Sequence, residues 1–227
     1  MREARGERVV GFKIGFTSPT VRTNAATLMG LDESVHGYLW EREAYLNGAE
    51  VAHARLGIEG ELAVSLIECA GDNVSNWVVD YQPIIELHML GYRPEQMWDG
   101  PPADNHGRRG LELIGTNCVH TGVVHCDTQR RGRIAEIPLD EIMRVHIGGK
   151  LIEEVTLTEL AVDGVYGPAG TIGWLLRTLR REANGEDALL RPGTQLLCST
   201  PGGLYPVPSG QGVEVAFAGM TTRCTAD

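Results

Sequence analysis

The stretch from Leu56 to Ile67 constrains the fold more than any other part of the sequence. Read with the two-residue period of a β-strand, one face is apolar and the other carries two carboxylates. The apolar face consists of Ile58, Gly60, Leu62, Val64 and Leu66, and the other face of Glu59, Glu61, Ala63 and Ser65. The two carboxylates lie about 7 Å apart along such a strand. Because Ala63 and Ser65 are small, we expect this face to line a half-open cavity.

The composition favours a sheet-rich fold. The 29 glycines and 11 prolines among 227 residues indicate many tight turns between short strands. We expect further strands at Val9 to Phe16, Glu50 to His53, Ile84 to Met89, Gln195 to Cys198 and Val213 to Ala218, and a hairpin from Arg144 to Thr156. Helices are expected from Ser18-Pro19 to Gly30 and from Gly170 to Ala183. Pro83 is expected to break the preceding segment, and Leu111 to Gly115 to begin a series of short strands.

Charge and hydropathy exclude several classes of protein. A net charge of -10 argues against nucleic-acid binding, and no apolar run approaches the roughly 20 residues that span a membrane. The five cysteines contain no Cys-x-x-Cys pair, which indicates reduced thiols. The N-terminus lacks the apolar core of a secretory signal. We therefore expect a cytoplasmic protein of one domain over residues 1–227, without an internal repeat or linker.

Paired carboxylates on one strand indicate either a solvated acidic face or a metal site. Two such groups at close range are costly to ionise unless a cation or proton lies between them. If Glu59 and Glu61 hold a metal, their oxygen ligands select a hard cation, Mg²⁺ or Mn²⁺. Glu86, inside the apolar segment Ile84 to Leu87, is either a third ligand or the partner of a nearby cation such as Arg93.

Lys13 lies in the middle of the first predicted strand, among apolar residues and glycines. One interpretation is a lysine that protects an edge strand. The other is a desolvated lysine with a lowered pKa, which could act as a general acid or base.

Two other motifs have weaker meaning. Cys118, His120, His125 and Cys126 are zinc-ligand residue types, but their spacing fits no common structural site. Core thiols with surface imidazoles are expected instead. Gly167, Gly170 and Gly173 open a helix but lack the features of a phosphate-binding loop, so we expect them to shape a loop that lines a cavity.

These pieces, in this order, resemble the 2-keto-4-pentenoate hydratase and 2-oxo-3-hexenedioate decarboxylase family of the fumarylacetoacetate hydrolase superfamily. The resemblance covers nearly the whole chain. Its matching segments are Gly11 to Thr17, His36 to Leu39, Ile58 to Ala63, Pro83 to Glu86, Ala103 to Asn105, Gly164 to Leu176 and Leu189 to Val215. The chain lacks most of the helical segment that precedes these motifs in typical members.

The resemblance implies a fold and a set of site residues. The fold is a mixed, sheet-rich α/β structure: a fumarylacetoacetase C-terminal-like β-roll with peripheral helices, usually in a homo-oligomer. The implied metal ligands are Glu59, Glu61 and Glu86, for Mg²⁺ or Mn²⁺. The implied catalytic residues are Lys13, Glu43 and Asp104. The implied substrate-binding residues are Lys13, Leu62, Asn105, Ser199 and Thr200.

The implied reaction is metal-dependent hydration of a 2-hydroxy-2,4-dienoate to a 4-hydroxy-2-oxo acid, in aromatic meta-cleavage catabolism. Such hydratases can associate with an aldolase or decarboxylase of the same pathway. One alternative within the superfamily is decarboxylation of 2-oxo-3-hexenedioate or hydrolysis of a C–C bond. An alternative of another class is a non-catalytic partner subunit that keeps the fold without turnover.

Overall fold

The computed structural model describes residues 6–31, 33–52, 55–69, 71–90, 106–183 and 190–227. The helices are α1 (Pro19–Met29), α2 (His106–Gly115) and α3 (Gly167–Glu182). The strands of the larger sheet are β1 (Val9–Gly15), β2 (Val35–Trp40), β3 (Ala44–Tyr45), β5 (Leu56–Glu68), β6 (Val78–Met89), β7 (His120–Val124), β8 (Arg130–Arg133), β13 (Gln195–Leu197) and β14 (Tyr205–Pro206). The strands of the smaller sheet are β4 (Ala49–Val51), β9 (Ile142–Ile147), β10 (Lys150–Thr156), β15 (Gly212–Phe217) and β16 (Met220–Ala226). A separate pair is formed by β11 (Ala161–Val162) and β12 (Val165–Tyr166).

The larger sheet is mixed. Its strands run in the order β2-β1-β13-β5-β6-β7-β3, with β14 paired to β5 and β8 paired to β6. The pairs β1–β13 and β3–β7 are parallel, whereas β5 pairs antiparallel with both β13 and β6. The smaller sheet runs β10-β9-β15-β16-β4. This arrangement confirms the predicted sheet-rich, mixed α/β class.

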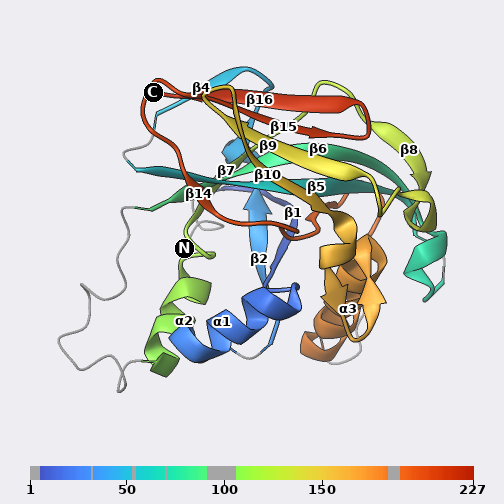
Figure 1. The fold of residues 1–227 in the computed structure, drawn as a ribbon. Coiled ribbons are helices and arrows are strands. Elements are labelled where there is room, and N and C mark those ends of the chain that lie inside the picture. Colours follow the sequence, from blue (N-terminus) through green and yellow to red (C-terminus); the bar gives the residue numbers. More distant parts are fainter. Residues whose placement is uncertain (1–5, 32, 53–54, 70, 91–105, 184–189) are drawn as a thin grey trace.

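The hydrophobic core lies between the two sheets. Ile58 and Leu62 on β5 are fully buried, and Gly60 between them lets the smaller sheet approach. A Cβ atom at Gly60 would lie 2.8 Å from Val145 of β9 and 3.3 Å from Val215 of β15. Figure 1 shows the smaller sheet above β5 and β6, with α1, α2 and α3 on the opposite side. The face of β5 that carries Glu59 and Glu61 therefore points away from the core.

Pro83 does not break a strand, contrary to expectation. It lies within β6 and pairs with Leu62 of β5. The Leu62 carbonyl accepts a hydrogen bond from Cys198, so the pair with Pro83 needs no backbone hydrogen bond from proline. On the other side of β6, β8 ends its pairing at Tyr81 and β7 begins at Ile85. The proline thus occupies a gap where a missing N–H costs little.

The segment that begins at Leu111 is also not a strand. Residues 106–115 form α2, and the Glu112 carbonyl accepts a hydrogen bond from Thr116 at 2.9 Å. A short apolar run cannot be assigned by periodicity alone, and Leu111, Glu112 and Leu113 are good helix formers. Among the described residues, no helix has both the length and the apolar character needed to cross a membrane.

Candidate metal centre

The register of β5 and β6 gathers the acidic side chains on one face of the larger sheet. Glu59 lies directly opposite Glu86, and Gly57 lies opposite His88. Directly opposed residues of an antiparallel pair project to the same face. Glu59, Glu61, Glu86 and His88 therefore share the face that points away from the core.

Lys13 reaches this face from β1. Strand β13 lies between β1 and β5, and its Leu197 pairs with Lys13 on one side and Ala63 on the other. Because β1 also pairs with β2, Lys13 is on an interior strand, and the interpretation as an edge-strand lysine is wrong. The side chain is 5% exposed, and its ammonium contacts Glu86 Oε1. The alternative partner Arg93 lies outside the described residues.

The buried carboxylates repel one another. Burial raises the pKa of Glu61 well above its usual range, and the charges of Glu86 and Glu59 raise it further. Burial also acts to raise the pKa of Glu86, but Lys13, His88 and His120 together hold it well below its usual value. Without a metal ion, these surroundings favour the protonated form of Glu61 and the charged form of Glu86.

The environment of Lys13 corrects the expectation of a lowered pKa. Burial does act to lower the pKa of the ammonium, but the charge of Glu86 outweighs it. The pKa of Lys13 is therefore raised, and Lys13 is a cation in this arrangement.

His88 was missed by the sequence analysis as a site residue. Its Nδ1 lies 3.2 Å from the Cys118 carbonyl, which can only accept, so Nδ1 carries the hydrogen. Its Nε2 lies 3.3 Å from Glu59 Oε2 and 3.6 Å from Glu86 Oε1. Nε2 is buried and makes no hydrogen bond with a described residue. Burial lowers the pKa of His88, but Glu86 and Glu59 outweigh this and raise it.

A strained turn holds the carbonyl that orients His88. Asn117, Cys118 and Val119 have positive φ angles of 56°, 56° and 53°. Such conformations are unfavourable for residues other than glycine and often occur at functional sites. The Asn117 amide fixes the turn by donating to the Tyr38 carbonyl at 2.8 Å and accepting from the Tyr38 N–H at 3.1 Å.

His120 and Glu43 extend the cluster on its other side. His120 Nδ1 lies 2.7 Å from Glu86 Oε1, and its Nε2 lies 3.5 Å from Glu43 Oε2. His120 is buried, so the expectation of a surface imidazole is wrong. Glu43 thus contacts His120, and it is not among the described residues that line the cavity described next.

The cluster lines part of a cavity of about 170 Å³. Lys13, Ser199 and Thr200 also line it, and Ser199 has a strained φ of 75°. The Thr200 hydroxyl donates to the Gly60 carbonyl at 3.1 Å, which fixes this loop over β5. The remaining wall is largely apolar and consists of Ile14, Phe16, Val21, Leu113, Val119 and Leu204, with Thr17, Ser18 and Cys118 beside them.

The structure thus gathers some predicted site residues and separates others. Those around the cavity are Lys13, Glu59, Glu61, Glu86, Ser199 and Thr200. Leu62 is not among them, because the alternation that turns Glu61 toward the cavity turns Leu62 into the core. Asp104 and Asn105 lie outside the described residues. His88 could have been found from the sequence, since it lies two residues after Glu86 on the same strand face.

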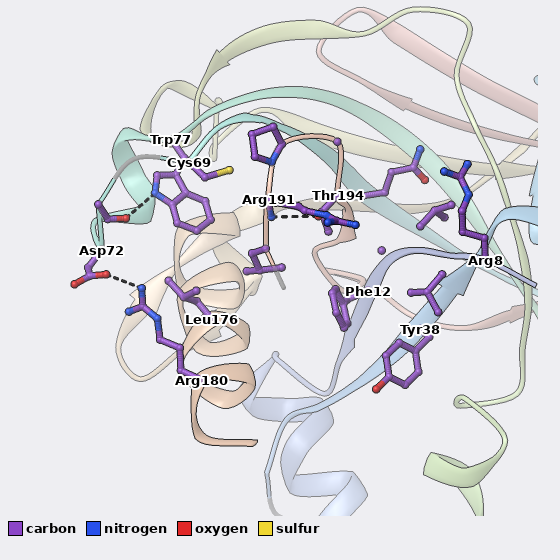
Figure 2. Close-up of a pocket in the computed structure, with 18 residues that line it drawn as sticks. Arg8, Phe12, Tyr38, Cys69, Asp72, Trp77, Leu176, Arg180, Arg191 and Thr194 are labelled. Atoms are coloured by element: carbon purple, nitrogen blue, oxygen red, sulfur yellow. Dashed lines mark hydrogen bonds and ion pairs between the residues drawn. The ribbon is translucent and has the colours of Figure 1, made fainter. Parts of the chain in front are cut away.

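A larger cavity of about 1080 Å³ opens between β1, β13 and α3 (Figure 2). Arg8, Asp72 and Arg180, three of the charged residues that line it, form ion pairs. Arg180 donates to Asp72 at 2.7 Å, and Arg8 pairs with Glu41 at 2.6 Å. The metal-ligand cluster does not line this cavity, so size does not identify the candidate site.

The small cavity offers donors that fit a divalent cation. Atoms of Glu59, Glu86 and His88 lie within 4.8 Å of one another. Glu61 is adjacent, with a buried Oε2 that has no hydrogen-bond partner among the described residues. Carboxylates with one imidazole form a donor set that suits Mn²⁺ and neighbouring transition metals as well as Mg²⁺. The fit differs from the predicted three-glutamate set by including His88.

Comparison with solved structures identifies proteins with a similar fold, whereas no family model and no curated protein sequence matches the chain. A 4-oxalocrotonate decarboxylase from Pseudomonas putida G7, solved with magnesium and adipate, matches with a TM-score of 0.75 and 19% identity over 100% of this chain and 81% of that one. A fumarylpyruvate hydrolase from Pseudomonas aeruginosa, solved with Mn²⁺ and pyruvate, matches with a TM-score of 0.63 and 14% identity over 95% and 88%.

A fumarylacetoacetate hydrolase family protein from Yersinia pestis CO92 is also similar, with a TM-score of 0.60 and 14% identity over 97% of this chain and 94% of that one. The resemblance inferred from the sequence motifs is confirmed at the level of architecture. The chain has the fold that these solved structures share.

Proposed function

We propose that the protein is a divalent-metal-dependent hydratase that adds water to a 2-hydroxy-2,4-dienoate and yields a 4-hydroxy-2-oxo acid. The observation that carries this proposal is the cavity, whose wall combines carboxylates and Lys13 with apolar side chains. A substrate with an anionic head and an uncharged tail matches both kinds of lining. The fold shared with a decarboxylase solved with magnesium and a hydrolase solved with Mn²⁺ supports the metal-dependent part.

The glutamates and Lys13 would have different roles, metal binding and substrate binding. Glu59, Glu61 and Glu86 would hold the ion, which when bound supplies a Lewis acid for the carboxylate and 2-oxygen of the substrate. Lys13 places a buried positive charge and N–H donors beside these glutamates. A substrate carboxylate would gain a charge-assisted hydrogen bond there.

The hydroxyl of Thr17 is a candidate for orienting the substrate or the attacking water. It is buried, its residue lines the cavity, and it makes no hydrogen bond within the described part of the chain. A buried hydroxyl without a partner is costly, so a ligand that bonds to it gains affinity. The apolar wall excludes bulk water, which strengthens each of these polar interactions.

The apolar wall favours hydration over decarboxylation of 2-oxo-3-hexenedioate. That alternative substrate carries a second carboxylate, which would need a cationic partner of its own. Among the described lining residues, Lys13 and His88 are the groups that can carry a positive charge, and both already contact the carboxylates of the cluster. The similarity to a decarboxylase solved with adipate, a dicarboxylate, keeps decarboxylation as the second candidate.

The test follows 2-hydroxypenta-2,4-dienoate absorbance with the metal-stripped protein, with added Mg²⁺ or Mn²⁺, and with EDTA. Metal-dependent loss of absorbance with formation of a 4-hydroxy-2-oxo acid is expected. Release of CO₂ from 2-oxo-3-hexenedioate, without hydration of the dienoate, would replace the hydratase by the decarboxylase. Metal binding without turnover of either substrate would indicate the non-catalytic alternative.

A further inference from the structure

The histidine in the acidic cluster has a geometry that the three-carboxylate set does not explain. His88 is 4% exposed, and its ring is fixed because Nδ1 donates to the Cys118 carbonyl at 3.2 Å. When the ring is neutral, this bond leaves the lone pair on Nε2, the nitrogen that faces Glu59 and Glu86. Metal-binding histidines commonly have this arrangement, in which one nitrogen donates to a carbonyl and the other is left to bind the ion.

Of the two distances from Nε2, the one to Glu59 matches that of two ligands sharing one ion, and the one to Glu86 is slightly longer. Two donor atoms that are each about 2.1 Å from a cation, at angles of about 90° to 110°, lie about 3.0 to 3.5 Å apart. Nε2 is 3.3 Å from Glu59 Oε2 and 3.6 Å from Glu86 Oε1. The three residues also form a group with mutual donor distances within 4.8 Å.

No hydrogen bond with a residue that the structure describes satisfies Nε2, although it lies at ion-pair distance, 3.3 Å, from Glu59 Oε2. The atom is buried. An unsatisfied buried polar atom costs about 1 to 3 kcal/mol. The turn that holds the opposite ring nitrogen is itself strained at three consecutive residues, Asn117 to Val119. Both costs are offset if Nε2 binds a ligand.

We infer that His88 Nε2 is a nitrogen ligand of the divalent cation, beside Glu59 and Glu86, and that it makes the centre prefer Mn²⁺ and similar transition-metal ions over Mg²⁺. This inference rests on the metal site of the proposed function and deepens it. Imidazole binds transition metals well, whereas Mg²⁺ requires oxygen ligands and gains little from a nitrogen. His88, rather than the carboxylates, then determines which ion the centre selects.

The direct test is pulsed electron paramagnetic resonance of the full chain loaded with one equivalent of Mn²⁺. The ¹⁴N hyperfine coupling of a coordinated imidazole is expected in the wild-type protein and in His120→Gln, and it is absent in His88→Gln. His120→Gln is the matched control, since His120 is also buried and lies 2.7 Å from Glu86. Bound Mn²⁺ without nitrogen coupling, coupling that persists in His88→Gln, or no Mn²⁺ binding would each overturn the inference.

Competition titrations provide a second readout. In His88→Gln, Mn²⁺ affinity is expected to fall about 10- to 100-fold, while Mg²⁺ affinity changes much less. An equal loss for both ions would remove the role in selectivity. If His88→Gln does not fold, the wild-type spectrum still decides whether nitrogen is bound. If nitrogen coupling is present but the dienoate is not hydrated, the proposed function fails and this inference stands.

Discussion

The two faces of strand β5 use the same backbone for opposite purposes. On the core face, Ile58 and Leu62 are fully buried against the smaller sheet, and the packing is apolar throughout. On the other face, Glu59 and Glu61 crowd against Glu86, and buried polar atoms remain without partners among the described residues. The core face therefore stabilises the fold. On the other face the buried carboxylates repel one another, and a bound cation would reduce this repulsion.

The largest effect is expected at the buried ion pair of Lys13 and Glu86. Lys13→Met leaves the Glu86 charge without its ammonium partner, and the metal-free protein should lose about 3 to 5 kcal/mol of stability. Urea unfolding followed by circular dichroism measures this loss. The control is Lys13→Met combined with Glu86→Leu, which removes both charges and should recover most of the stability. A double variant as unstable as Lys13→Met would show that the loss comes from packing rather than from the unpaired charge.

A change on the core face should separate stability from metal binding. Leu62→Ala removes a fully buried side chain and is expected to cost about 2 to 5 kcal/mol of unfolding free energy. The Mn²⁺ affinity of the folded protein should stay nearly unchanged, because the Leu62 side chain points away from the cavity. Calorimetric titration below the unfolding transition tests this expectation. A large loss of Mn²⁺ affinity would mean that the two faces are not independent.

Glu61→Gln should have the opposite effect to Leu62→Ala: metal binding is lost while stability is kept. In the metal-free protein the stability should not fall much, because burial and the charges of Glu86 and Glu59 disfavour the ionised form of Glu61, which glutamine lacks. Metal binding should be abolished. At 100 times the dissociation constant, Mn²⁺ stabilises a single-site protein by about 2.7 kcal/mol, and this gain should appear in the wild type only. Equal Mn²⁺ stabilisation of both proteins would remove Glu61 from the site.

The smallest change in stability is expected at Asp80 of β6, which lies on the same sheet face as Glu86 but near solvent. The hydrogen bonds from Arg131 lower the pKa of Asp80, although its partial burial acts against them. A carboxyl with a lowered folded-state pKa stabilises the protein above its unfolded pKa of about 3.9 and loses this contribution as the pH falls through the folded value. Asp80→Asn should therefore flatten the stability profile slightly below pH 4. An identical acid profile in wild type and variant would contradict this assignment.

The sequence predicted what depends on local alternation. The strand around Glu59 and Glu61, the hairpin of β9 and β10 and the helix α3 follow from periodicity and turn residues. The same alternation places Leu62 in the core, so its implied substrate role conflicts with the strand pattern itself. Family resemblance added Glu86 and Lys13, which periodicity alone left undecided.

What could not be predicted depends on contacts between distant segments. Pro83 is tolerated because β7 and β8 leave a gap beside it, which no local pattern reveals. The fixed tautomer of His88 requires the strained turn around Cys118, and His120 reaches Glu86 only because β7 pairs with β6. The raised pKa of Lys13 likewise arises from a partner 73 residues away.

The most direct test of the central claim is a calorimetric titration of the metal-stripped full chain with MnCl₂, beside the double variant Glu59→Gln with Glu86→Gln. We expect one ion bound per wild-type chain, released by EDTA, and no binding in the variant. No binding to the wild-type protein, or the same affinity in the double variant, would contradict the claim that this face of β5 and β6 is a metal centre.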